Sequence, residues 1–141
     1  MTEINIANFS KKVKLPKSKI LKLAKSIINE EKLNFSTLNI IFVDDKTIHE
    51  INKKFLNHDY PTDVISFDLS DDFDDEKISE IYISVDRAIE QAKVYKVTTE
   101  NEIARLVAHG LLHLAGYNDS TKSEKLKMRR KESYYIKMAG F

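Results

Sequence analysis

The stretch between residues 99 and 119 restricts the fold of this chain more than any other part of it. Apolar residues recur there at the spacing of one helix face: Ile103, Leu106, Val107, Gly110, Leu111 and Leu114. Thr99 followed by Glu102 fits a capping box, so Thr99 is expected to cap this helix. Gly110 costs a helix about 1 kcal/mol relative to alanine. Its place inside the apolar stripe predicts a close contact with another element as compensation.

Two histidines and an aspartate form the strongest candidate site. His109 and His113 are four residues apart, so both rings leave the same helix face. Gly116 permits a left-handed turn, and Asp119 follows where the chain has turned back towards the rings. Two imidazoles and one carboxylate suit zinc or a similar ion and leave a position open for water. A second interpretation stays open, in which the histidines are structural and Asp119 caps the next helix.

Several classes of protein and site are excluded or disfavoured. The zinc-protease pattern His-Glu-x-x-His is absent, because Gly110 follows the first histidine. The chain has no cysteine, so a metal must be held by nitrogen and oxygen. His49 and His58 have no partner at ligand spacing and are interpreted as surface or structural residues. No signal peptide or membrane-length apolar run is recognisable, so we expect a cytoplasmic protein without a membrane partner.

The remaining patterns predict a single α+β domain over residues 1–141. Residues 3–9, 38–43, 64–69 and 78–85 have the apolar patterns of strands, the first two parallel. Helical patterns follow Pro16, Asp44 or Asp45, Val85 and Thr121, in addition to the helix that carries the histidines. We therefore expect a mixed sheet of about four strands packed with about five helices.

Charge is balanced overall but segregated along the chain. The net charge is +1, from 23 Lys and Arg against 22 Asp and Glu. Seven lysines lie between Lys11 and Lys25, and the last helix carries six cations before residue 132. Such runs are either solvated faces or phosphate tracks. Six carboxylates lie between Asp68 and Glu76 without the spacing of a calcium-binding loop, which predicts a solvated hairpin loop.

Three segments together resemble one known family. His-Gly-x-Leu-His-Leu-x-Gly-Tyr at residues 109–117, the block at 52–67 and the strand at 80–84 are similar to the YbeY family of bacterial ribosomal RNA maturation factors. That resemblance implies a metal-dependent endoribonuclease that cuts single-stranded RNA. It implies one divalent metal ion, zinc, on His109, His113 and the residue at position 119. The implied partners are ribosomal RNA or a ribosomal subunit, and no DNA.

The chain departs from the family pattern at two positions. Position 119 most often holds a histidine in the family and is Asp119 here. The family commonly has an arginine after the aromatic residue of its second block, where this chain has Leu56. Candidate replacements for that cation are basic residues elsewhere in the chain: Lys53, Lys54, Arg129 and Arg130.

Three functions follow from these observations. The first is the endoribonuclease, in which either a metal-bound water attacks phosphorus or the metal braces the phosphate while another group activates the nucleophile. The residues alone identify no catalytic group beyond that water. The second is a non-nucleolytic RNA-binding assembly factor with a structural metal, which the loss of the arginine favours. The third is a metal-dependent hydrolase of another substrate.

Overall fold

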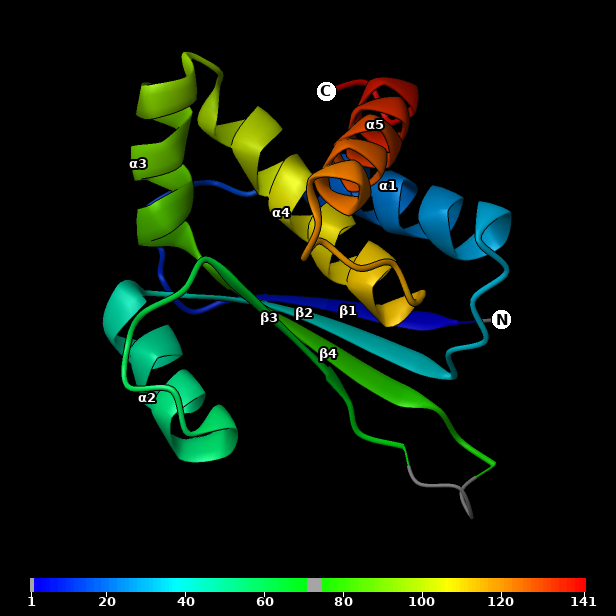
Figure 1. Cartoon of the computed structure of the whole chain (residues 1–141), viewed down its shortest axis with the longest axis horizontal. Coiled ribbons are helices and arrows are strands. Elements are labelled where there is room, and N and C mark those ends of the chain that lie inside the picture. The colour runs from blue at the N-terminus through cyan, green and yellow to red at the C-terminus, as the bar shows by residue number, and fades with distance from the viewer. Residues whose placement is uncertain (1, 71–74) are drawn as a thin grey trace.

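A computed structural model describes residues 2–70 and 75–141, and Figure 1 shows its arrangement. Helices and strands alternate through the first half of the chain, and helices fill the last third. Within the described residues the elements are β1 (Glu3–Asn8), α1 (Lys17–Glu30), β2 (Thr37–Val43), α2 (Asp45–Leu56), β3 (Val64–Asp68), β4 (Ile78–Ser84), α3 (Val85–Tyr95), α4 (Thr99–Leu114) and α5 (Lys122–Met138). The predicted α+β class, with four strands and five helices in this part of the chain, is confirmed.

The sheet is mixed, and its strand order is β1-β2-β4-β3. β1, β2 and β4 are parallel, whereas β3 runs antiparallel to β4. The first two strands are parallel, as the sequence predicted, and Ile4 pairs with Leu38 in their register. The β3–β4 hairpin brackets the predicted acidic loop, of which residues 71–74 lie outside the described residues.

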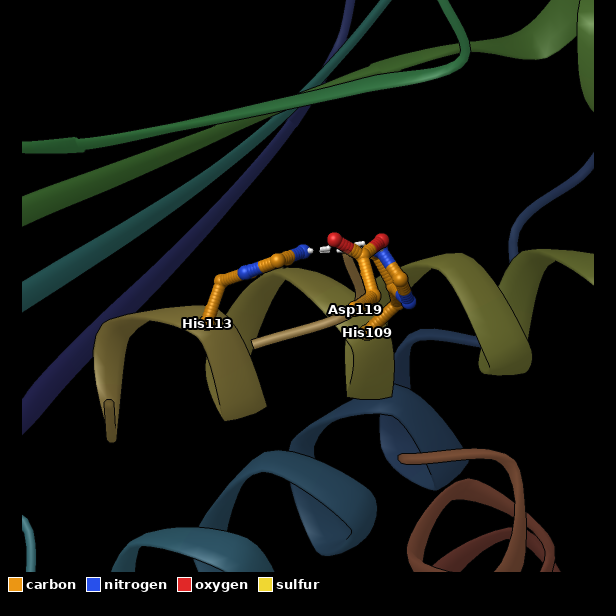
Figure 2. Close-up of side chains that lie close together, drawn as sticks. All are labelled: His109, His113 and Asp119. Atoms are coloured by element: carbon orange, nitrogen blue, oxygen red, sulfur yellow. Dashed lines mark hydrogen bonds and ion pairs between the residues drawn. The ribbon is translucent and has the colours of Figure 1, made fainter. Parts of the chain in front are cut away.

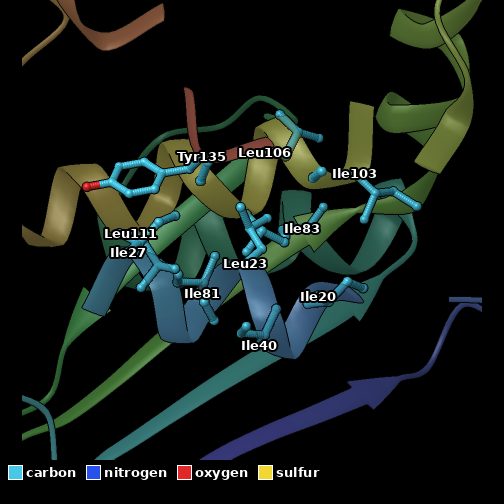
Figure 3. Close-up of a cluster of buried hydrophobic side chains, with 14 of the residues drawn as sticks. Ile20, Leu23, Ile27, Ile40, Ile81, Ile83, Ile103, Leu106, Leu111 and Tyr135 are labelled. Carbon is cyan, nitrogen blue, oxygen red and sulfur yellow. The ribbon is translucent and has the colours of Figure 1, made fainter. Parts of the chain in front are cut away.

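The two faces of the sheet are covered unequally. Ile40, Ile81 and Ile83 point to the face covered by α1, α4 and α5, where the main core lies (Figure 3). Ile41 and Tyr82 point to the other face, where α2 builds a small separate cluster. The alternation follows from the two-residue repeat of a strand. The helix that carries the histidines is therefore sandwiched between the sheet and α5.

Gly110 brings α4 into close contact with the sheet. A Cβ atom at this position would lie 2.9 Å from Ile81 Cγ2. The Ser66 hydroxyl donates a hydrogen bond to the Gly110 carbonyl oxygen at 3.0 Å. The predicted close contact is confirmed, and it offsets the helix propensity that a glycine forfeits.

The helix caps agree with the predictions except at α4. Asp44 caps α2, and Thr121 with Glu124 forms the complete capping box of α5. The α4 cap is Thr98, one residue before the predicted Thr99. Thr98 has the extended backbone that a cap requires and accepts from the Asn101 N–H, whereas Glu102 is buried inside the helix. Among the described helices, none combines the length and the apolar character that crossing a bilayer requires.

Candidate metal centre

His109, His113 and Asp119 converge on one point beside α4 (Figure 2). The two Nε2 atoms of His109 and His113 are 3.0 Å apart. Asp119 Oδ2 lies 3.4 Å from each of these Nε2 atoms. The three side chains are partly exposed, with the carboxylate the most open at 41%. The predicted site residues therefore form one group that could hold a metal ion.

The separations within this group fit a tetrahedral metal centre. Two ligand atoms bonded at 2.0–2.1 Å to one tetrahedral zinc ion are about 3.3 Å apart. The three edges of the triangle, 3.0, 3.4 and 3.4 Å, have that size. Three protein ligands of the nitrogen and oxygen type also leave a fourth position for water or substrate.

The loop after α4 brings Asp119 back over the histidines. Gly116 has a φ of +101°, a left-handed conformation that suits glycine. The N–H groups of Gly116 and Tyr117 donate to His113 and Leu112 carbonyl oxygens, which closes the helix as a Schellman motif. Because Thr121 caps α5, Asp119 has no capping role there and its carboxylate faces the histidines.

Glu132 of α5 contacts the His109 ring on the nitrogen that faces away from His113 and Asp119. Its Oε2 lies 2.7 Å from His109 Nδ1, and its Oε1 accepts from the Arg105 guanidinium at 3.0 Å. A proton on Nδ1 leaves the Nε2 lone pair directed at the centre of the site. Burial alone would lower the pKa of His109, but the hydrogen bond and charge of Glu132 outweigh it and raise that pKa.

Sequence reasoning missed Glu132, although a signal was present. Met128, Tyr135 and Ile136 form the buried stripe of α5, and Glu132 lies on it at helical spacing. A carboxylate at a buried stripe position needs a partner, because an unpaired buried charge is costly. In the sequence Glu132 directly follows a run of cations, Arg129, Arg130 and Lys131, and the basic character of the helix was the stronger pattern.

His109, His113 and Asp119 form one wall of a hollow of about 390 Å³. The opposite wall comes from β3 and the loop before it. The lining residues are Thr62, Asp63, Val64, Ser66, His109, His113 and Asp119. Four of them belong to the 52–67 block on which the family resemblance rested, but their role was not predicted. The site is thus open to a substrate that reaches between α4 and β3.

The basic candidates lie outside this hollow. Lys53 and Lys54 are exposed at the end of α2, on the other face of the sheet from α4. Arg129 and Arg130 are exposed on α5. His49 pairs with Asp59 at 2.9 Å, away from the site, in agreement with its interpretation as a surface residue.

His58 has the same kind of local role. Its ring stacks on Tyr60 with centroids 5.3 Å apart, and both residues are exposed. It is absent from the metal-ligand group found among the described residues. The exposure of His58 agrees with its interpretation as a surface or structural residue.

Fold and site together define a small α+β protein with an open two-histidine, one-carboxylate centre. Residues 5–140 match the family model described as Endoribonuclease YbeY. The chain belongs to this family. An Endoribonuclease YbeY of Flavobacterium psychrophilum is 44% identical over 113 residues, which cover 80% of this chain and 79% of the relative. That of Amoebophilus asiaticus is 39% identical, covering 96% and 94% of the two chains.

A solved structure has the same fold. The solution structure of TM1509 from Thermotoga maritima aligns with a TM-score of 0.67 at 30% sequence identity. The alignment covers 96% of this chain and 88% of the Thermotoga chain. The predicted resemblance to the YbeY family is thus confirmed over nearly the whole chain.

Proposed function

We propose that this chain cleaves single-stranded RNA as a metal-dependent endoribonuclease, with zinc held by His109 Nε2, His113 Nε2 and Asp119 Oδ2. The observation that carries the proposal is the triangle of ligand atoms with edges of 3.0, 3.4 and 3.4 Å. Membership of a family of endoribonucleases supplies the class of reaction, the hydrolysis of RNA phosphodiester bonds.

The residues of the site divide into holding and positioning groups. When bound, a divalent cation with an open coordination position polarises a phosphoryl oxygen and activates a water molecule. His109, His113 and Asp119 hold it, and Glu132 fixes the tautomer and direction of the His109 ring. Two nitrogen donors and one oxygen donor fit zinc, with manganese more acceptable than in a three-histidine site because a carboxylate is a harder ligand.

We propose ribosomal RNA as the substrate and the cytoplasm as the compartment, on the strength of family membership. The hollow beside the proposed metal ligands is lined by polar groups from Thr62, Asp63 and Ser66. A single strand would place one phosphate against the metal ligands there. The exposed Arg129 and Arg130 of α5 are candidates for binding flanking phosphates.

One observation favours a second candidate function. Leu56, in the position where the family commonly has arginine, is 40% exposed at the end of α2. An apolar side chain there cannot bind phosphate. The alternative is an RNA-binding assembly factor whose metal stabilises the fold and which does not cut RNA.

Metal analysis combined with RNA cleavage tests the proposed function. Purified protein should contain one zinc ion per chain and cut a single-stranded RNA but not DNA of the same sequence. A chelator should abolish cleavage, and added zinc should restore it. His109→Ala and His113→Ala should each lose both metal and cleavage, while His49→Ala and His58→Ala should retain both. Full metal occupancy without any cleavage would favour the assembly factor instead.

A further inference from the structure

β1 forms one edge of the sheet, and the outer side of its first half is open. Among the described strands it pairs with β2 alone. Glu3 N–H donates to Ser36 on the β2 side, so the alternation of a parallel ladder directs the backbone groups of Ile4 and Ile6 to the free side. At the end of β1, the Asn8 side chain donates a hydrogen bond to the Val13 carbonyl oxygen, in the segment that follows the strand.

A groove of about 690 Å³ lies between this edge and α1. Its volume is typical of ligand-binding clefts. Its floor is apolar and its rim is polar. The lining residues are Thr2, Ile4, Leu21, Lys25, Ile28, Asn29, Lys32, Leu33, Asn34 and Phe35. The free strand edge and an apolar groove therefore lie side by side.

The charge of the groove is positive. Lys25 and Lys32 are its titratable lining residues, and both are exposed. The two acids at the end of α1 contact α5: Glu30 accepts from the Tyr134 hydroxyl at 3.1 Å. Glu31 likewise accepts from Lys131 of α5. The end of α1 thus presents its cations to the groove and its carboxylates to α5.

We propose that this edge and groove bind an extended acidic segment of another protein, which adds to the sheet as a strand beside β1. Backbone hydrogen bonds to Ile4 and Ile6 would hold the segment, and alternate side chains would enter the groove. Apolar side chains match the floor, and carboxylates match Lys25 and Lys32. RNA has no backbone N–H and C=O groups to pair with a strand edge. A second copy of this chain would place the same lysines opposite each other.

The location of the groove separates this interaction from RNA cleavage. β1 and β3 are opposite edges of the sheet, and the hollow beside the metal ligands is walled by β3. A partner bound along β1 leaves that hollow accessible. The interaction would therefore bring this protein to its partner without blocking access to the hollow beside His109, His113 and Asp119.

A fluorescein-labelled peptide of the repeat Val-Ser-Glu-Ser, which presents valine and glutamate in turn on one face of a strand, tests the proposal by fluorescence polarisation with the full chain. It should bind, while the matching peptide with lysine in place of glutamate should not. Lys25→Glu with Lys32→Glu should weaken binding about tenfold or more, since two attractions become repulsions. Lys17→Glu with Lys22→Glu changes the net charge equally on exposed positions of α1 outside the groove, and should leave binding within about twofold. RNA cleavage should be the same in all variants.

Hydrogen exchange measured by NMR separates strand addition from other binding. The amides of Ile4 and Ile6 should become protected when the acidic peptide is added. Binding without that protection, or equal binding of the basic peptide, would overturn the proposal. So would displacement of the peptide by single-stranded RNA, or a dimer of the chain that forms along β1. Failure of the peptide to bind at millimolar concentration would overturn it as well.

Discussion

Glu132 Oε2 lies 2.7 Å from His109 Nδ1, so a carboxylate of the last helix sets the direction of a proposed metal ligand on the preceding helix. Glu132 is itself buried and held by Arg105 at 3.0 Å. Such partners orient a histidine ring and increase its basicity towards a metal. α5 therefore contributes to the site although none of its residues lines the hollow.

Glu132→Gln should weaken metal binding by about tenfold or more, because the amide keeps an acceptor but loses the charge. A competition titration against a chelator measures this affinity. Ser133→Ala is the matched control, since it removes the other contact of Arg105 without touching the histidine. Equal affinity of the Glu132→Gln and wild-type proteins would show that Glu132 only packs the interface of α4 and α5.

The contacts of Glu31 predict that the free energy of unfolding depends on pH. Burial opposes its charge, but hydrogen bonds from Tyr135, Tyr117 and Lys131 outweigh burial and lower its pKa below the ordinary 4.5. The stabilisation is complete above that value and is lost as the pH falls through the lower pKa of the folded protein. Glu31→Gln should cost about 1–3 kcal/mol at pH 7.

Urea unfolding at neutral and acidic pH measures the difference in free energy of unfolding between the Glu31→Gln and wild-type proteins. It should shrink as the pH falls well below 4.5, where the wild-type carboxylate also becomes protonated. Glu30→Gln, on the adjacent exposed carboxylate, should change stability by less than about 0.5 kcal/mol. A loss for Glu31→Gln that is constant from neutral to acidic pH would contradict the assignment.

The basic face of α5 can be tested by salt dependence. Arg129→Ser with Arg130→Ser should weaken binding of single-stranded RNA and reduce the slope of log affinity against log salt by about 1.4, from two lost phosphate contacts. Lys77→Ser with Lys93→Ser removes equal charge elsewhere and should leave the slope unchanged. If both double variants behave like wild type, the α5 arginines form only a solvated surface.

The sequence predicted local features well because their physical causes are local. The stripe around Gly110, the cap at Asp44 and the capping box of Thr121 all depend on residues within a few positions of each other. The pattern favoured Thr99 over Thr98, because Glu102 follows Thr99 at the spacing of a capping box. In the structure Thr98 is the cap and Glu102 is buried, and burial depends on the tertiary fold.

The remaining features depend on contacts between distant parts of the chain. The insertion of β4 between β2 and β3 has no local signal. The wall formed by Thr62, Asp63 and Ser66 opposite the histidines arises from that strand order. Glu132 reaches His109 across 23 positions of sequence. The convergence of His109, His113 and Asp119 was predictable because the two histidines share one helix face and Gly116 returns the chain.

Asp119 should determine which metal the site prefers. Asp119→His should preserve binding and increase the preference for zinc over manganese, because imidazole is the softer ligand. Asp119→Ala should lose much of the affinity, since two histidines alone hold a divalent ion weakly. Asp68→Ala, on an exposed carboxylate outside the hollow, is the control and should leave affinity unchanged. Unaltered zinc binding by Asp119→Ala would contradict a ligand role.

The crystal structure of the zinc-loaded protein, with the ion located by anomalous scattering, tests the central claim most directly. We predict one ion about 2.0–2.2 Å from His109 Nε2, His113 Nε2 and Asp119 Oδ2, with a fourth position facing the hollow. An ion bound to both histidines with the Asp119 carboxylate more than about 4 Å away would contradict the three-residue centre. So would an ion bound elsewhere on the protein.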